Sequence, residues 1–308
     1  MTFLKYHAQI VLFVFLLIGF FTGCAAPPKK LMLTDIHHAY PQDTIFDSKM
    51  AKQVSFETLM EKLNTVKVIY IGERHVDTNH HAVQLNVIKS LHETNPDLCV
   101  GMEMFDRTYQ EVLNHWVDGE LDESEFLKRT HWYANWRYPF DLYRDILLFI
   151  KENNISLIGL NIAFHIPPKI AVGGLESLLD DDKKHLPQII NTEHELHRQY
   201  VEKVFEGHRS RGRDNFETFY EAQCVWEDTM AETIALSPCD GPMVVLAGNG
   251  HIIYKFGIPD RVFRLKPMPF ITIFPVPAGS TAESGYADYI WVTPEIQNPH
   301  RMVIHHRP

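Results

Sequence analysis

The sequence predicts an α/β fold, with a mainly parallel β-sheet flanked by helices and a small helical domain inserted before the last strands of the sheet. Short apolar runs alternate with stretches of helical periodicity, the pattern of parallel strands joined by helical crossovers. Two runs, residues 68–71 and 243–247, are each followed by the same motif, Gly-x-x-His. The strand pattern is absent between residues 166 and 236, where the sequence is polar and helical.

The expected elements follow in a regular order after residue 50. Apolar residues at helical spacing predict one helix before the first strand and another after His75. Later strands and helices are expected at residues 98–102 (strand), 109–128 (helix), 140–152 (helix), 155–160 (strand) and 243–247 (strand). The runs 270–274 and 289–292 predict two late strands, which could be antiparallel at the edge of the sheet.

Composition divides the chain of 308 residues into six segments. They are a lipoprotein signal peptide (1–23), a membrane-tether linker (24–50), the first part of the α/β domain (51–165), a helical insert domain (166–237), the second part of the α/β domain (238–295) and a tail (296–308).

The N-terminus predicts export and a lipid anchor. Lys5 precedes the apolar stretch 10–21, which is shorter than the roughly 20 residues of a membrane-spanning helix. The sequence Phe21-Thr22-Gly23-Cys24 resembles a bacterial lipobox, which implies cleavage before Cys24 and lipidation of that residue. No Ala-x-Ala site competes for a cleavage that would release a soluble protein. Because Ala25-Ala26 follows in place of an aspartate, we expect anchoring in the bacterial cell envelope, at the outer membrane.

The charge argues against nucleic-acid binding, and the cysteine content argues against a disulfide framework. The formal net charge is -10 and no basic stripe appears, which argues against binding of nucleic acid. Three cysteines remain if Cys24 is lipidated. Cys99 lies in an expected core strand. Cys224 lies well before the end of an expected helix, and the few residues between that end and Cys239 cannot bring the Cys224 and Cys239 thiols together. We therefore expect no disulfide framework.

Acidic and histidine side chains follow the predicted strands. Glu73 and His75 come after the first, Glu103 after the run 98–102, and His251 after the run 243–247. The carboxyl ends of parallel strands meet at one edge of a sheet, where ligands bind. We expect these four side chains to lie together, in an arrangement suited to metal or acid–base chemistry. The alternative is ordinary turn chemistry.

An aromatic segment, residues 131–143, is the most unusual stretch of the chain. It contains six aromatic residues, broken by polar residues and Pro139. Such side chains offer wide amphipathic surface for a large planar ligand. They could equally seal the hydrophobic core.

These motifs together resemble the ChaN-type haem-binding lipoproteins of the Tiki superfamily. The resemblance is carried by 71–75 with Gln84, 101–105, Trp136-x-Tyr138-Pro139 with 142–143, 207–208, Gln223-x-x-Trp226-x-Asp228-x-Met230-Ala231, 247–251, and 257–259 with Arg261. It covers nearly the whole mature chain. It implies a parallel α/β domain with a small helical domain, haem binding, a part in iron uptake and a homodimer that holds haem between its subunits.

For the haem site, Tyr138 is the first choice as ligand of ferric iron, because a phenolate is a hard anionic donor. Tyr133 and Tyr143 are the alternatives. Other expected contacts are Trp136 and Phe140 against the porphyrin, and His165 or His208 at a propionate. The arginine that the resemblance would place soon after Asn161 is absent. An outer-membrane haem or iron receptor is a candidate partner.

Two other functions remain open from the sequence. In a metal-dependent hydrolase of the protease or esterase type, Glu73, His75, Glu103 and His251 would bind a metal or activate water. In a scaffold lipoprotein, the same site would be inactive. The resemblance favours haem binding over hydrolysis.

Overall fold

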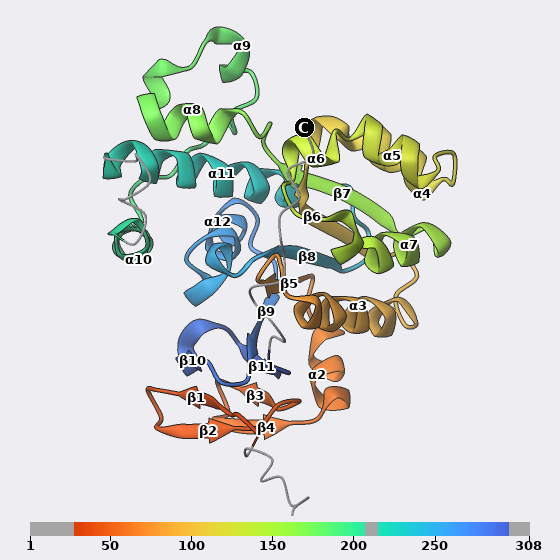
Figure 1. Ribbon diagram of the computed structural model, residues 1–308, viewed down its shortest axis with the longest axis vertical. Helices are drawn as coiled ribbons and strands as arrows, with labels where there is room; N and C mark the ends of the chain where they lie inside the picture. Colours follow the sequence, from red (N-terminus) through yellow and green to blue (C-terminus); the bar gives the residue numbers. More distant parts are fainter. Residues whose placement is uncertain (1–27, 207–214, 296–308) are drawn as a thin grey trace, which may run out of the picture.

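The computed structural model describes residues 28–206 and 215–295. Its larger sheet has eight strands in the order β4-β3-β11-β9-β5-β8-β6-β7, and Figure 1 shows this sheet running through the middle of the molecule. The strands are β3 (Ile45–Asp47), β4 (Lys52–Val54), β5 (Val68–Glu73), β6 (Cys99–Asp106), β7 (Ser156–Asn161), β8 (Met243–Gly248), β9 (Phe270–Pro277) and β11 (Tyr289–Thr293).

The sheet is parallel except at one edge. Strands β5 and β8 pair in parallel along six residues, and β6, β7, β9 and β11 continue in the same direction. The late strands β9 and β11 are therefore not the antiparallel edge that the sequence suggested. That edge is the hairpin of β3 and β4, of which β3 pairs antiparallel with β11.

Helices cover both faces of the sheet. Alternate residues of β5 point to opposite faces, so that Ile69 and Ile71 enter one core while Val68 and Tyr70 enter the other. The first face packs against α2 (Phe56–Leu63), α3 (Thr78–His92), α4 (Gln110–Val117), α5 (Glu123–Arg129) and α7 (Arg144–Glu152). The second face packs against α11 (Phe216–Leu236) and α12 (Ile258–Leu265).

A helical lobe lies at one end of the molecule (Figure 1). It consists of α8 (Ile166–Gly173), α9 (Asp180–Lys183), α10 (Glu195–Glu206) and the first half of α11. Small apolar clusters hold it together, among them Ile166, Ile170 and Val225. The second half of α11 leaves the lobe, because Met230 and Ile234 are buried against the sheet. This long helix thus joins the lobe to the α/β core.

The N-terminal region differs from the expected linker at residues 24–50. Strands β1 (Leu31–Leu33) and β2 (His38–Tyr40) form a second, three-stranded sheet with β10 (Thr281–Ala282), and β3 belongs to the main sheet. Leu31 and Leu33 are fully buried. Strands of three residues are too short to give a recognisable alternation, and β1 and β3 each take one partner, β10 and β11, from the far end of the chain.

A disulfide joins Cys99 to Cys239, contrary to the expectation of none. Cys99 is the first residue of β6, not an interior one, and its backbone N–H donates to the carbonyl of Pro242 at 3.0 Å. Cys239 lies in the loop before β8, the neighbour of β6. The register of two strands distant in sequence brings the thiols together. Cys224 is free and buried.

Within residues 28–206 and 215–295, no helix is long and apolar enough to cross a membrane. The predicted signal peptide, Cys24, His208 and the predicted tail lie outside the described residues.

Candidate functional site

The carboxyl ends of β5, β6 and β8 carry the four side chains that the sequence placed at one edge of the sheet. Glu73 ends β5 and His75 follows in the turn, while Glu103 lies in β6 and His251 in a short 3-10 turn after β8. These strands are neighbours in the order β5-β8-β6. The four side chains lie together in the structure, and their contacts are described below.

The glycines of the two Gly-x-x-His motifs make room for the partner motif. A Cβ at Gly248 would lie 3.2 Å from Nε2 of His75 and 3.0 Å from its Cε1. A Cβ at Gly72 would overlap with Oδ1 of Asn249. Each glycine therefore admits a side chain of the neighbouring strand end, and the repeated motif is explained by this mutual close approach.

Glu73 is a buried carboxylate that fixes the first histidine. Its Oε1 accepts hydrogen bonds from the Tyr143 hydroxyl at 2.6 Å and from Nδ1 of His75 at 2.8 Å. Its Oε2 accepts from Gln84 at 2.9 Å. Burial raises the pKa of Glu73, but hydrogen bonds from His75 and His81 outweigh burial and hold it far below its usual range. The bond to Nδ1 leaves Nε2 of His75 for other partners.

The second histidine lies between two carboxylates. Nε2 of His251 lies 3.5 Å from Oε1 of Glu103, and its Nδ1 lies 3.1 Å from Oε1 of Glu227. Burial lowers the pKa of His251, but the charge of Glu103 and the bonds to both carboxylates raise it to about 10. The backbone N–H of Gly248 donates to Glu103 at 2.6 Å. His251 is thus a fixed cation at neutral pH.

Glu227 connects the site to a buried layer of charge that sequence analysis missed. Nε of Arg261 lies 3.2 Å from Glu227, and Nη1 of the same guanidinium lies 2.6 Å from Asp228. Nε2 of His197 lies 3.0 Å from Oε2 of Glu227, the oxygen that Nε of Arg261 also contacts. Burial raises the pKa of Glu227, but His197, His251 and Arg261 lower it by more. The net shift is downward, and the carboxyl is ionised. Asp228 and Arg261 belong to the motifs quoted above, but nothing in their spacing indicated this contact.

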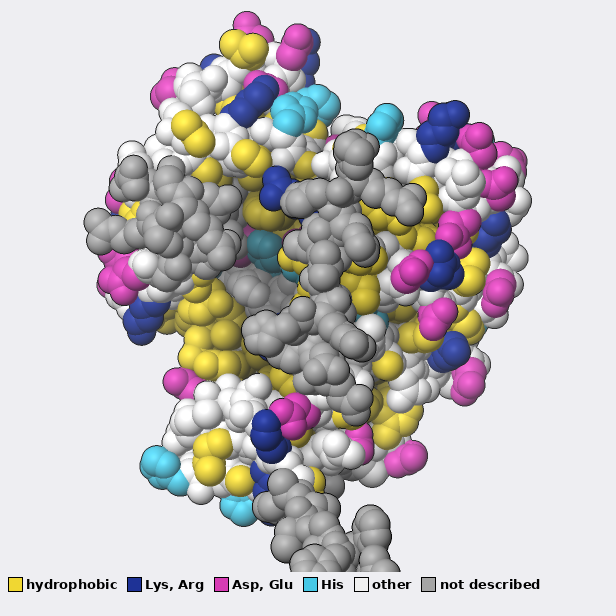
Figure 2. All heavy atoms as spheres, in the orientation of Figure 1, with side chains coloured by type: hydrophobic (Ala, Val, Ile, Leu, Met, Phe, Trp, Pro, Cys, Tyr) yellow, Lys and Arg dark blue, Asp and Glu magenta, His cyan; other side chains and the backbone are white. Residues whose placement is uncertain are grey.

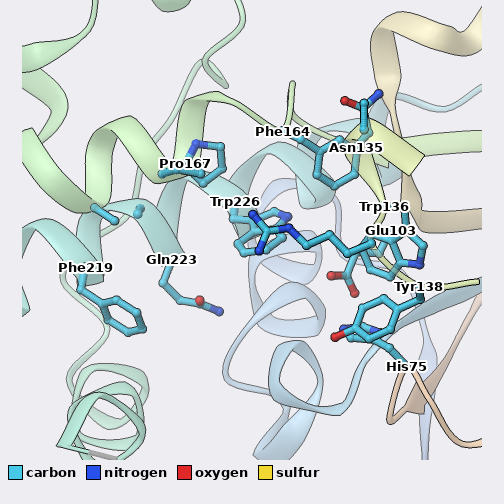
Figure 3. Close-up of a pocket in the computed structure, with 15 residues that line it drawn as sticks. His75, Glu103, Asn135, Trp136, Tyr138, Phe164, Pro167, Phe219, Gln223 and Trp226 are labelled. Carbon is cyan, nitrogen blue, oxygen red and sulfur yellow. The ribbon is translucent and has the colours of Figure 1, made fainter. Parts of the chain in front are cut away.

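A cavity of about 340 Å³ opens beside these side chains. Hydrophobic side chains gather around a hollow near the centre of the face shown in Figure 2. Figure 3 shows His75 and Tyr138 side by side on one wall, with Phe219 and Gln223 on the opposite wall. The apolar lining comes from the aromatic segment, the β7–α8 connection, α8 and α11: Trp136, Phe164, Pro167, Phe219 and Trp226.

The structure divides the candidate haem residues into two groups. Trp136 and Tyr138 line the cavity, and the Tyr138 ring lies 4.9 Å from the His75 ring between centroids. Burial, followed by the charges of Glu103 and Glu73, raises the pKa of the Tyr138 phenol. Phe140 is buried in the core, where it packs edge-on against Trp132.

The remaining candidates do not line the cavity. Tyr133 is 64% exposed, on α6 (Trp132–Asn135). Tyr143 is fully buried, with its hydroxyl bonded to Glu73. His165 lies 3.1 Å from Asp182 in the helical lobe. His208 lies outside the described residues.

The sequence gave no role to several lining residues. Gln223 and Trp226 belong to a motif quoted above, and Gln223 donates to Glu227 at 2.7 Å. Phe164 and Phe219 also line the cavity, and only the packing of α8 and α11 could reveal them. Among the described residues, no group of three or more His, Cys, Asp or Glu side chains is arranged to hold a metal ion.

The sequence and the fold of this chain are similar to those of known proteins. Residues 59–262 match the model of the family described as haem-binding uptake, Tiki superfamily, ChaN. The fold is similar to that of ChaN of Campylobacter jejuni with cofacially bound haem, at a TM-score of 0.66, with 20% identity over 80% of this chain and 95% of that one. The chain is also 22% identical over 280 residues to the chloroplastic protein RETICULATA-RELATED 5 of Arabidopsis thaliana. That alignment covers 80% of this chain and 37% of the plant protein, so the chain spans little more than a third of it.

Proposed function

Since this chain belongs to the haem-binding uptake family of the Tiki superfamily, we propose that it is a lipid-anchored protein that holds ferric haem through Tyr138 and serves haem or iron acquisition. The observation that carries the proposal is the position of Tyr138. Of the three candidate tyrosines, Tyr138 alone lines the cavity. Tyr133 is exposed outside it, and the hydroxyl of Tyr143 is taken by Glu73.

The residues present fit haem in size and chemistry. A volume of about 340 Å³ lies within the roughly 300–1,000 Å³ of ligand pockets, and the cavity opens to solvent so that a porphyrin edge can protrude. Trp136, Phe164 and Trp226 offer aromatic surface for a flat apolar ring. The Tyr138 oxygen is a hard donor of the kind that ferric iron prefers. When bound, haem would supply the iron that this oxygen coordinates.

The open side of the cavity also supports a dimer. A haem that protrudes from one subunit leaves an apolar face exposed, and a second copy of the chain would cover it. We propose that two such chains meet over their cavities. Analytical ultracentrifugation with and without haemin tests this, and a sedimentation coefficient that haemin leaves at the monomer value would contradict it.

The disulfide supports an exported protein. Disulfides persist in oxidising compartments and are rare in the bacterial cytosol. The bond between Cys99 and Cys239 therefore fits the proposed cell-envelope location, with Cys24 as the lipid anchor and the outer membrane as the destination. Replacement of Cys24 by serine should abolish incorporation of radioactive palmitate. Equal labelling of both forms would remove the anchor from the proposal.

Haemin titration of the detergent-solubilised full chain tests the haem site. We expect a saturable Soret shift and the high-spin spectrum of a phenolate ligand in the wild type. Tyr138→Phe should weaken binding at least tenfold, because it removes the ligand oxygen but keeps the ring. Tyr133→Phe is the matched control and should bind as the wild type does. If Tyr138→Phe binds with unchanged affinity and spectrum, the ligand is another residue.

One observation favours a second candidate function, hydrolysis. The pair of Glu73 and His75 orients an imidazole beside the cavity with Nε2 free of hydrogen bonds to the described residues. Such a pair can activate water as a general base. A panel of ester and peptide substrates, assayed with added divalent metals, tests this reading. Turnover that His75→Gln abolishes would support it.

A further inference from the structure

The wall of the cavity carries one cationic side chain of lysine or arginine type among the described residues, that of Arg137. It stands between the two haem candidates Trp136 and Tyr138, and its side chain is exposed. None of the ion pairs between described residues involves it. By contrast, the buried Arg261 is paired with two carboxylates.

The carboxylates beside the cavity already have partners among the described residues. Glu103, which lines the cavity, is paired with His251, and Glu73 is bonded to His75. The chain as a whole has a formal charge of -10. An anionic ligand would be repelled by this field, unless a local cation meets its charged edge. Arg137 is the cation at that place.

Two basic side chains next in sequence to the lining residues Phe164 and Pro168 already have an acidic partner. Nζ of Lys169 lies 2.8 Å from both oxygens of Asp182, and Nε2 of His165 lies 3.1 Å from the same carboxylate. His165, which the sequence suggested as a propionate contact, is therefore occupied within the helical lobe. Neither residue lines the cavity.

We propose that Arg137 binds a propionate carboxylate of the haem, so that the site recognises the acidic edge of the porphyrin as well as its iron. This rests on the proposed haem binding at Tyr138. A guanidinium pairs with a carboxylate through two parallel hydrogen bonds, which fixes direction as well as adding affinity.

Ligands that lack the carboxylates, or lack the iron, separate the two contacts. Haemin, haemin dimethyl ester and metal-free protoporphyrin IX are titrated into the detergent-solubilised full chain, with a detergent blank. Absorbance follows the first two and fluorescence the third. The variants are Arg137→Gln, Arg137→Lys and Tyr138→Phe, and the matched control is Arg129→Gln, an exposed arginine outside the cavity.

We expect Arg137→Gln to weaken haemin and protoporphyrin IX about tenfold, or ~1.4 kcal/mol, and to leave the dimethyl ester unchanged. Arg137→Lys should recover part of the loss, and Arg129→Gln should lose nothing. Tyr138→Phe should weaken only the two ligands that contain iron. The spectrum of the bound haem iron should be the same in Arg137→Gln as in the wild type, because the propionate contact does not touch the metal.

The experiment distinguishes a failure of the proposed haem binding from a failure of the propionate contact. If the wild type binds none of the ligands saturably, the haem function itself fails. If it binds haemin and Arg137→Gln binds haemin equally well, the propionate contact alone is wrong. An equal loss of haemin and its dimethyl ester in Arg137→Gln would also overturn it, since the side chain would then act through packing.

Discussion

Reduction of the Cys99–Cys239 disulfide should destabilise the protein without changing its folded structure. The two chain segments that carry the cysteines are already in backbone contact, because the N–H of Cys99 bonds to the carbonyl of Pro242 at 3.0 Å. A Cβ at Gly241 would overlap with the carbonyl oxygen of Asp97, so the two chain segments touch there as well. The disulfide therefore acts mainly on the unfolded chain, whose freedom it restricts.

The size of the effect follows from the length of the closed loop. The two cysteines are 140 residues apart in sequence. The chain-entropy relation gives about 5 kcal/mol for a loop of this length at 25 °C, and measured disulfides typically contribute roughly 2–4 kcal/mol. We therefore expect the unfolding free energy to fall by roughly 2–4 kcal/mol on reduction. This is a large part of the roughly 5–15 kcal/mol of an ordinary domain.

Urea unfolding of the oxidised and the phosphine-reduced protein measures this loss directly. The midpoint should fall on reduction, and the m-value should rise, because the reduced unfolded chain exposes more surface. The double variant Cys99→Ala/Cys239→Ala should match the reduced protein and should not respond to the reductant. If thiol titration shows full reduction and the midpoint does not move, the disulfide does not stabilise the fold in this way.

Three further predictions concern the site. Tyr143→Phe removes the hydroxyl that donates to Glu73 at 2.6 Å, and should lower the unfolding free energy by roughly 1–3 kcal/mol in urea; an unchanged midpoint would mean that water replaces the donor. Gly248→Ala brings a methyl group within 3.2 Å of Nε2 of His75, and should shift the His75 ring resonances and lower stability by about 1 kcal/mol or more; unshifted resonances would contradict the close approach. The raised pKa of His251, about 10 against an ordinary 6.5, means that its contribution is full below pH 6.5 and is lost as pH rises toward 10. Stability measured by urea unfolding should decline over that range with a slope of at most about 1.4 kcal/mol per pH unit from this group, and His251→Gln should flatten the decline.

The sequence could predict the site edge because strand ends are local features. Each Gly-x-x-His motif follows its own apolar run, and the rule that parallel strands share one carboxyl edge brings His75 and His251 together. Glu103 was found in the same way, although β6 continues three residues beyond it to Asp106. Nothing in this inference needed a distance between elements.

What the sequence could not predict depends on such distances. The contact of Glu227 with His251 joins α11 to the turn after β8, and the disulfide joins the start of β6 to the loop before its neighbour β8. The choice among tyrosines is similar, since Tyr138 and Tyr143 are five residues apart in one aromatic segment. Only the packing of that segment against Glu73 separates a tyrosine on the cavity wall from one buried beneath it.

The electrostatics of the site favour binding of a ligand more than catalysis. A general base works best when its pKa lies near the working pH, so that it can both take and return a proton. His251, with a pKa of about 10 between Glu103 and Glu227, keeps its proton at neutral pH and serves to neutralise the two carboxylates. The pKa of His75 is lowered by burial but raised more by its bond to Glu73 and by the charge of Glu103, which also favours the protonated form. His251 therefore offers a fixed charge near the aromatic cavity, and its raised pKa makes it a poor general base at neutral pH. This supports the proposed binding of a ligand over a proton-transfer role for His251.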